Sequence, residues 1–255
     1  MTLSVLITGA SSGVGAALAQ AYAKRGAKLG LVARRSDELE KLAKQLPSQS
    51  IVLTADVRDS ASMQSAAAQF IERFGVPDIV IANAGVSYGT ATERCEDIAT
   101  FSEILDSNVL GMVRTFQPVL SAMRLRKSGS LVGVASVAGF RGLPGSGAYS
   151  ASKAAAISYL ESLRVELHGS GVSVTTFCPG YIATPMTARN LYRMPFILSA
   201  QQAAQKMILA IDRRRDFVIL PWQMALVGRM MRVLPNRLYD TLAAKSGRKP
   251  RKTAS

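Results

Sequence analysis

The sequence predicts an α/β fold, a doubly wound parallel sheet of about seven strands with helices on both faces. Short runs rich in Val, Ile and Leu alternate along the chain with amphipathic stretches, which is the pattern of βα units. These short runs are apolar throughout, as expected of strands buried on both faces. Because no linker-like composition interrupts the pattern, we predict a single domain over residues 1–245 and a basic, flexible tail over 246–255.

The apolar runs give the predicted strands, which are Leu3–Thr8, Lys28–Ala33, Ile51–Ala55, Asp78–Ala82, Ser130–Ala135, Val172–Cys178 and Asp216–Leu220. Helical periodicity between them predicts helices at Val14–Arg25, Asp37–Leu46, Ala61–Phe74, around Phe101–Arg126 and at Ser150–His168. The periodicity weakens after Thr184. Residues 184–221, with a helix at Ala200–Asp212, are expected to form a lid over the carboxyl ends of the strands. C-terminal helices are expected within 222–245, the first at Trp222–Leu234.

Composition argues against several classes of protein. No apolar run reaches the roughly 18 residues of a membrane-spanning helix, and the N-terminus enters its first apolar run without the basic segment of a signal peptide. Two cysteines, Cys95 and Cys178, without a CxxC motif favour a reducing, cytoplasmic setting. The single histidine, His168, argues against a His-rich metal site and a Ser-His-Asp triad, and we predict no metal.

The chain carries a formal net charge of +14. Five basic residues lie in the last eleven, and about +9 remains without them; they are Lys245, Arg248, Lys249, Arg251 and Lys252. A solvated tail is the simplest explanation, with attraction to an anionic cofactor or an acidic membrane surface as alternatives. A nucleic-acid partner is not expected, because the sequence has no zinc-finger or aromatic RNA-binding pattern.

A glycine-rich turn follows the first predicted strand and leads into a helix, with the sequence Thr8-Gly9-Ala10-Ser11-Ser12-Gly13-Val14-Gly15. Glycines allow a tight turn and a close approach of the backbone to a pyrophosphate, and the helix start offers free N–H groups to an anion. The spacing is GxxxGxG, which differs from both GxGxxG and GxxxxGK[ST]. The turn predicts a phosphate-binding loop, with an ordinary tight βα turn as the alternative.

Tyr149 and Lys153 lie four residues apart at the start of a predicted helix and therefore share one helical face. A tyrosine with an ordinary pKa near 10 is a poor proton donor or acceptor at neutral pH. A nearby ammonium favours the phenolate and lowers that pKa, so the pair suits proton exchange with a carbonyl/alcohol couple. A bare YxxxK pair also arises often by chance on exposed helices.

These motifs together resemble the short-chain dehydrogenase/reductase family over nearly the whole chain, which implies a Rossmann-like fold. The loop Thr8–Gly15 is similar to the coenzyme loop of the family, and Ala55-Asp56-Val57, Asn83-Ala84-Gly85 and Pro179-Gly180 follow later strands in the family's order. The family's Asn-Asn-Ala-Gly begins here with Ala82 instead of Asn. The resemblance implies cofactor contacts from Gly9, Ser11, Ser12, Gly13, Val14, Gly15, Asp56, Val57, Asn83, Ala84, Gly85, Pro179, Gly180, Ile182 and Thr184, as well as from Tyr149 and Lys153.

The residues after the second predicted strand bear on the choice of nicotinamide cofactor. An acidic residue there binds a ribose 2′-hydroxyl and repels a 2′-phosphate, whereas this chain has Ala33-Arg34-Arg35. A guanidinium presents a planar fork of donors that suits a phosphate. NADP(H) is therefore favoured over NAD(H), with Arg34 as the first candidate. The alternative is that one or both arginines lie on a solvated face.

The resemblance also implies a catalytic tetrad of Asn108, Ser136, Tyr149 and Lys153. In the family the serine holds the substrate oxygen, the tyrosine exchanges the proton, the lysine lowers the tyrosine pKa and holds the nicotinamide ribose, and the asparagine supports a water. The implied activity is NADP(H)-dependent interconversion of a carbonyl and a secondary alcohol. A cofactor-binding sensor or scaffold without turnover is one alternative. An enzyme of the sugar-nucleotide epimerase branch is another, although GxxxGxG and 255 residues argue against it.

The C-terminal third leaves the substrate and the partners open. Apolar residues of the predicted lid suit an apolar or lipid-like substrate, although ordinary packing also explains them; they are Met186, Leu191, Tyr192, Met194, Phe196, Ile197 and Leu198. The segment Trp222–Leu234 mixes apolar and basic residues, so residues 222–255 are a candidate for weak contact with a membrane surface. It could equally pack on the domain or on a partner subunit. The long helices around Phe101–Arg126 and Ser150–His168 resemble those that pair subunits in the family, which implies a homodimer or homotetramer.

Overall fold

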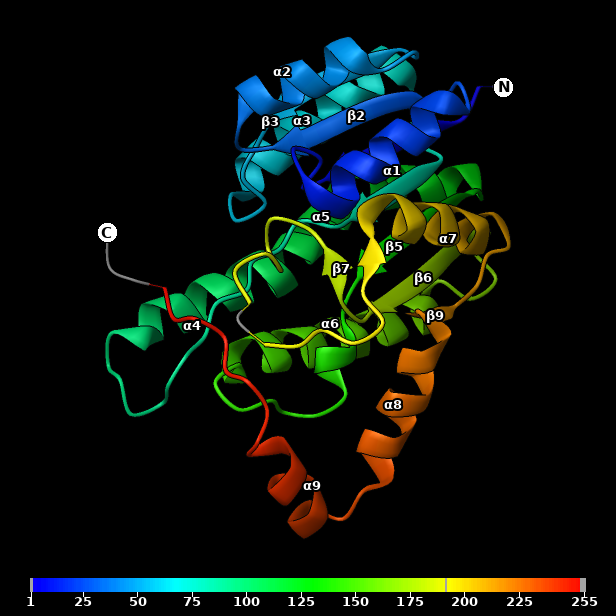
Figure 1. Ribbon diagram of the computed structural model, residues 1–255. Coiled ribbons are helices and arrows are strands. Elements are labelled where there is room, and N and C mark those ends of the chain that lie inside the picture. Colours follow the sequence, from blue (N-terminus) through cyan, green and yellow to red (C-terminus); the bar gives the residue numbers. More distant parts are fainter. Residues whose placement is uncertain (1, 191, 253–255) are drawn as a thin grey trace.

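The apolar runs form one parallel sheet in the computed structural model, which describes residues 2–190 and 192–252 (Figure 1). Within these residues seven strands lie in the order β3-β2-β1-β4-β5-β6-β9. Their bounds are Ser4–Thr8 for β1, Lys28–Ala33 for β2, Ser50–Thr54 for β3, Ile79–Ala82 for β4, Gly129–Val134 for β5, Val172–Pro179 for β6 and Phe217–Leu220 for β9. Each bound lies within one residue of its prediction, so the predicted fold class is confirmed.

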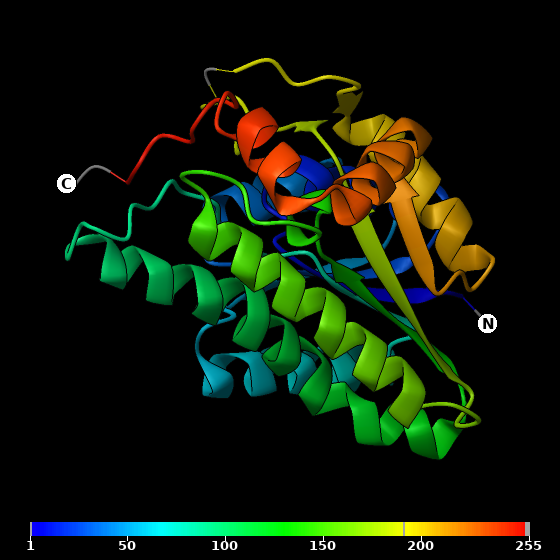
Figure 2. The ribbon, with the colours of Figure 1, turned by 90° about the horizontal axis from the view of Figure 1, so that it is seen from below.

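Helices cover the sheet on both faces and bury two separate apolar cores. One face carries α1 (Gly13–Lys24), α2 (Ser36–Gln45) and α7 (Ala200–Asp212), and the other carries α3 (Ser60–Phe74), α5 (Gly111–Arg126) and α6 (Gly147–Glu166). Figure 2 shows α6 alongside the long helical run that ends in α5. Strands buried between two helical layers have no polar face, which explains their continuous apolar sequences.

The long predicted helix around Phe101–Arg126 contains a change of helical geometry. It begins as α4 (Asp97–Leu105), passes through a π-helical segment at Asp106–Leu110 and continues as α5. Single π turns of this kind occur frequently at functional sites, because they redirect side chains within a helix. Asn108 lies in this segment and is buried.

The strand order reverses direction between β1 and β4, which lie side by side although β2 and β3 separate them in sequence. In open α/β sheets such a switch point opens a crevice at the carboxyl ends of the strands. The loops after β1, β4, β5 and β6 converge there. The sheet topology therefore places the glycine-rich turn and the predicted catalytic residues at the same edge.

The C-terminal part contains the segment predicted to form a lid, together with two peripheral helices. Strand β7 (Ile182–Ala183) pairs with β8 (Leu198–Ser199) in a second, two-stranded sheet, and α8 (Trp222–Val233) and α9 (Asn236–Ala243) project beyond the main sheet (Figure 1). In the described part of the chain, no helix has the length and apolar content that crossing a membrane requires.

The last described residues differ from the predicted solvated tail. Residues 247–252, here called the strap, run from α9 toward α4 (Figure 1). The Pro250 carbonyl accepts a hydrogen bond from the Gly89 N–H at 2.8 Å. Arg251 bonds both carboxylate oxygens of Asp97, at 2.8 and 2.9 Å, and Lys252 bonds Glu103 at 2.6 Å. The prediction missed this because the acidic partners lie about 150 residues earlier in the chain.

Candidate active site

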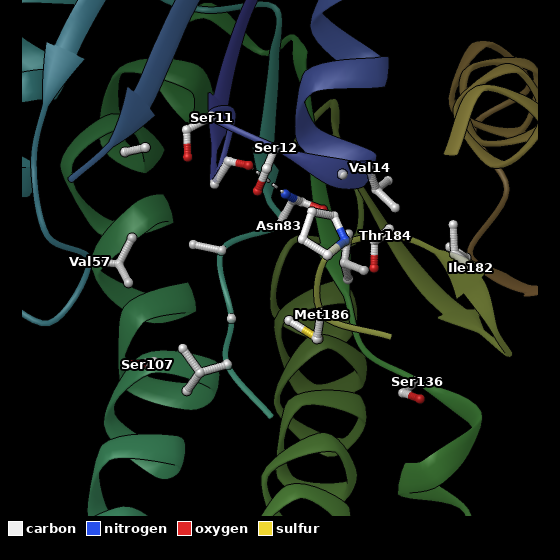
Figure 3. A pocket seen from close by; sticks show the side chains of 18 of the residues that line it. Ser11, Ser12, Val14, Val57, Asn83, Ser107, Ser136, Ile182, Thr184 and Met186 are labelled. Atoms are coloured by element: carbon white, nitrogen blue, oxygen red, sulfur yellow. Dashed lines mark hydrogen bonds between the residues drawn. The ribbon is translucent and has the colours of Figure 1, made fainter. Parts of the chain in front are cut away.

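A cleft at the carboxyl ends of the strands contains most of the predicted site residues (Figure 3). Its volume of about 340 Å³ lies within the range of small-molecule sites. Of the residues predicted to bind the cofactor or react, only Gly15 and Asn108 do not line it. The cleft also includes Met186 of the predicted lid and residues for which no contact was predicted, which are Val32, Ala33, Ala55, Val86, Ser107, Val134, Ala135, Pro185 and Thr187.

The glycine-rich turn is shaped by backbone contacts that exclude side chains. Gly9 has a φ of +67°, a conformation that other residues rarely adopt. A Cβ on Gly15 would lie 2.2 Å from the Gly9 carbonyl oxygen, so Gly15 lets the start of α1 pack onto the turn. The Asn83 side chain braces the turn by donating to the carbonyls of Thr8 at 3.0 Å and Gly9 at 3.3 Å. Asn83 therefore has a positioning function in this structure.

The start of α1 fits an anionic phosphate group. Ser12 caps α1 without a side-chain hydrogen bond to the helix, and the first-turn N–H groups of a helix have no partner within it. Ser12, Gly13 and Val14 line the cleft. The Arg35 guanidinium donates to the hydroxyls of Ser11 at 3.0 Å and Ser12 at 3.4 Å, which adds a positive charge beside the turn. Free donors, a helix dipole and a cation together suit a pyrophosphate.

Arg34 and Asp56 lie at the far end of the same cleft. The Arg34 side chain is 58 % exposed, and its guanidinium is 3.9 Å from the Asp56 carboxylate. Asp56 is held mainly by Arg58, whose shortest bond to it is 2.6 Å, and these bonds lower the pKa of Asp56 against the opposing effect of burial. Arg58 thus bonds the side chain of Asp56, for which the resemblance implies a cofactor contact. Arg34 keeps free donors toward solvent.

The first residues of the lid lie across the cleft from the glycine-rich turn. A Cβ on Gly13 would come within 3.1 Å of the Thr184 side chain. Thr187 holds this stretch in place, because its hydroxyl donates to the Ile182 carbonyl at 2.6 Å and accepts from the Thr184 N–H at 3.0 Å. Figure 3 shows Thr184 and Met186 facing the glycine-rich turn. Leu191, which was predicted to belong to the lid, is outside the described residues.

Ser136, Tyr149 and Lys153 meet at the end of the cleft away from Arg34. Ser136 follows β5 and is buried, with its hydroxyl accepting from the Ala138 N–H at 3.1 Å. Tyr149 lies in the first turn of α6 and Lys153 one turn later, with 5.7 Å between the ammonium and the centre of the phenol ring. The Lys153 ammonium donates to the Val134 carbonyl at 2.8 Å.

The pKa directions at this end of the cleft differ from the prediction. Burial raises the pKa of Tyr149, against the lowering effect of its hydrogen bond with Ser136. Burial also lowers the pKa of Lys153 to about 8. Both shifts have the same origin, because a low-dielectric environment disfavours phenolate and ammonium alike. The net shift therefore favours the neutral phenol of Tyr149, the form that donates a proton.

Asn108 lies behind the reacting residues and does not line the cleft. Its amide joins three elements, because Oδ1 accepts from the Val86 N–H at 2.8 Å and Nδ2 donates to the Val86 carbonyl and to the Ser152 hydroxyl, both at 3.0 Å. These bonds tie the π-helical segment to the loop after β4 and to α6. The predicted role of Asn108 in holding a water remains a prediction.

One further charged group, which the sequence did not indicate, lies beside Tyr149. The ammonium of Lys249, on the strap, lies 4.1 Å from the centre of the Tyr149 ring and donates to the Ser87 hydroxyl. Ser107 also lines the cleft and directly precedes Asn108, so its proximity was available from the sequence. No local pattern around Lys249 indicates its position, because the contact spans 100 residues of chain.

Comparisons with known proteins agree with this site. The family model for short chain dehydrogenases matches residues 4–193. An uncharacterized oxidoreductase of Myxococcus xanthus is 41 % identical over 244 residues, covering 94 % of this chain and 96 % of that protein.

Two solved structures share the fold. A short chain dehydrogenase/reductase from Burkholderia phymatum, in complex with NAD, superimposes with a TM-score of 0.82 at 25 % identity, covering 100 % of this chain and 98 % of the other. An alcohol dehydrogenase from Thermococcus sibiricus, complexed with 5-hydroxy-NADP, gives 0.77 at 26 % identity, covering 86 % and 96 %. With a family model that spans most of its length and a relative that is 41 % identical, the chain belongs to the short-chain dehydrogenase/reductase family of oxidoreductases.

Proposed function

We propose that the protein is an NADP(H)-dependent oxidoreductase that interconverts a carbonyl and a secondary alcohol, with Tyr149 as the proton donor and acceptor. The convergence of Ser136, Tyr149 and Lys153 at one end of a cleft, with the glycine-rich turn further along it, carries this proposal. Similar solved proteins hold NAD or an NADP derivative, which supports a nicotinamide cofactor in this cleft.

The preference for NADP(H) rests on charge at the end of β2. Ala33 stands where an acidic side chain would repel a 2′-phosphate, and Arg34 and Arg35 follow it and line the cleft. Arg34 has exposed donors for a phosphate. Arg35 is bonded to Ser11 and Ser12, so it supports the turn as well as adding charge.

The residues at the reacting end have separable functions. When bound, the nicotinamide cofactor supplies or accepts the hydride. The Ser136 hydroxyl is proposed to hold the substrate oxygen, and Tyr149 to donate to that oxygen a proton that its raised pKa keeps available near neutral pH. Lys153, one turn along α6, is proposed to hold the ribose of the cofactor. Asn108 is proposed to support the water that resupplies the proton, and its bonds to Val86 and Ser152 position α6.

The substitution Tyr149→Phe tests this function. It removes only the hydroxyl, so the variant is expected to bind NADPH normally in calorimetry while reduction of a ketone panel falls by about 10²–10⁴-fold. Tyr159→Phe is the matched control, because Tyr159 lies on the same helix but packs against the core. Full turnover by Tyr149→Phe would overturn the assignment. A cofactor-binding sensor predicts instead that the unsubstituted protein binds NADPH and consumes none of it against any carbonyl.

We propose that the protein assembles as a homodimer or homotetramer through α4, α5 and α6. These helices and the π-helical segment between α4 and α5 expose large apolar side chains that the described residues leave uncovered, namely Ile98, Leu110, Leu125 and Val165. Burial of such side chains favours association. Multi-angle light scattering gives the mass directly, and a monomer at micromolar concentration would contradict this proposal.

Helix α8 is the remaining candidate for a membrane contact in a protein otherwise expected in the cytoplasm. It exposes Trp222, Leu226, Met230 and Val233 together with Arg229 and Arg232, the composition of helices that lie on anionic membranes. Arg251 and Lys252 of the strap are already paired with acidic residues, so the proposal narrows to residues 222–245. Flotation with anionic vesicles tests this proposal. If the protein does not bind the vesicles, the membrane contact is refuted, and packing of α8 against a partner subunit is the alternative.

A further inference from the structure

A second cavity, of about 220 Å³, lies beside the cleft, between the strap and the beginning of the lid. Met186 lines both cavities. The second cavity is basic, because Arg189, Lys249, Arg251 and Lys252 line it and, within residues 2–190 and 192–252, no acidic side chain does. A concentration of positive charge in a recess attracts anionic groups.

The cations of this cavity differ in how they are compensated. Arg251 is paired with Glu96 and Asp97, and Lys252 with Glu103. Lys249 contacts no carboxylate in the described part of the chain; its ammonium donates to the Ser87 hydroxyl and faces the Tyr149 ring. Burial lowers the pKa of Lys249 to about 8, so it stays largely charged at neutral pH. Burying an ammonium without an anionic partner costs free energy, and the negative charge of a bound ligand would offset that cost.

Backbone contacts fix Lys249 in this position. The strap packs so closely on Gly89 that a Cβ there would lie 2.3 Å from the Lys249 carbonyl oxygen. The Gly89 N–H donates to the Pro250 carbonyl, and Arg251, the residue after Pro250, is paired with Asp97. The ammonium is therefore held beside Tyr149 before any substrate binds, and such preorganisation strengthens binding.

We propose that Lys249 is a specificity-determining residue, whose ammonium binds an acidic group of the carbonyl substrate while the reacting oxygen lies at Ser136 and Tyr149. The substrate class is then a ketone that bears a carboxylate or a phosphate ester. Met186, which lines both cavities, offers an apolar contact to a chain that joins the two groups. This inference rests on the proposed function.

Matched pairs of ketones test the inference with NADPH as reductant. The pairs are 5-oxodecanoate with its methyl ester, and dihydroxyacetone phosphate with dihydroxyacetone, which also separates a carboxylate from a phosphate. The unsubstituted protein is expected to prefer an acidic member. Lys249→Gln should raise KM for that member by about 10–100-fold relative to KM for its neutral partner, the effect of losing a charged hydrogen bond. Lys249→Arg should restore much of the preference, and Lys245→Gln, which removes an equal charge at an exposed position, should change neither.

The outcomes separate this inference from the proposed function. If neutral and acidic ketones are reduced equally well, and Lys249→Gln changes both by the same factor, Lys249 does not select an acidic group and the inference is wrong. A uniform gain in kcat would mean that the strap obstructs the site, which also overturns it. A different result would count against the proposed function instead. In that case the unsubstituted protein binds NADPH but reduces neither pair of ketones, and a wider panel of ketones is not reduced either.

Discussion

The two arginines after β2 allow a sharp test of cofactor preference, because they have different surroundings. Arg34 is 58 % exposed and lies 3.9 Å from Asp56, with no closer ion pair in the described residues. Arg35 bonds the hydroxyls of Ser11 and Ser12. We therefore expect Arg34→Ala to weaken binding of NADPH alone, since only NADPH carries the 2′-phosphate. Arg35→Ala should weaken NADPH and NADH together, since it also releases the phosphate-binding turn.

The magnitude follows from the exposure of Arg34. A hydrogen bond to a charged group contributes about 1.5–3 kcal/mol, and solvent screening of a side chain more than half exposed places Arg34 at the lower end. A loss of about 1.5 kcal/mol raises the Kd for NADPH about tenfold. The Kd for NADH should stay within about twofold, as for surface changes generally.

Isothermal titration of NADPH and NADH against the unsubstituted protein and the two variants gives the Kd values. For each variant and each cofactor, the ratio of the variant's Kd to that of the unsubstituted protein is compared with the expected change. Arg73→Ala is the matched control, because Arg73 is an exposed arginine near the end of α3 and does not line the cleft. The reasoning is refuted if Arg34→Ala weakens NADH as much as NADPH. It is also refuted if the unsubstituted protein binds NADH at least as tightly as NADPH.

Two further expectations concern the glycine-rich turn and Lys249. Gly15→Ala should abolish tight NADPH binding and lower stability by about 1–3 kcal/mol, because the new Cβ meets the rigid Gly9 backbone; an unchanged Kd and Tm would contradict this. The depressed pKa of Lys249, about 8 against 10.5, means that the unfolded chain binds more protons between those values, so this group makes stability rise with pH there. Urea unfolding at pH 7.5 and at pH 9.5 tests this. Between the two pH values, the free energy of unfolding of Lys249→Gln should fall by about 1–2 kcal/mol relative to that of the unsubstituted protein. If the difference between the two proteins is the same at both pH values, Lys249 is an ordinary, solvated lysine.

The sequence was sufficient for the fold because the relevant signals are local. Each strand is a short apolar run whose neighbours break the pattern, and burial between two helical layers requires such runs to be apolar throughout. The same locality explains the glycine-rich turn, since Gly9 and Gly15 are six residues apart and their spacing reflects the close contact between them. Tyr149 and Lys153 are one helical turn apart, so their proximity also follows from sequence.

Electrostatics depends on packing, and here the sequence was less informative. An ammonium one turn from a phenol predicts a more acidic tyrosine, but the structure buries both groups, and burial raises the pKa of Tyr149. Asp56 shows the same difficulty, because its carboxylate, for which the resemblance implies a cofactor contact, is bonded by Arg58 two residues later. Spacing specifies which groups are near each other, whereas the surrounding dielectric and the remaining partners decide what state they are in.

The strap shows why a terminal cluster of charge cannot be interpreted from composition. Five basic residues at a chain end have the composition of a solvated tail, and nothing local distinguishes Lys249 from Lys245. Their different surroundings are set by α4, which presents Asp97 and Glu103 to Arg251 and Lys252. Asp97 is buried, and the Arg251 guanidinium and the Ala91 N–H lower its pKa. Its contribution to holding the strap is therefore present above the ordinary Asp pKa, near 4, and is lost only as pH falls below it. Across the neutral range the strap stays attached, which keeps Lys249 beside Tyr149 under the conditions in which the enzyme would meet its substrate.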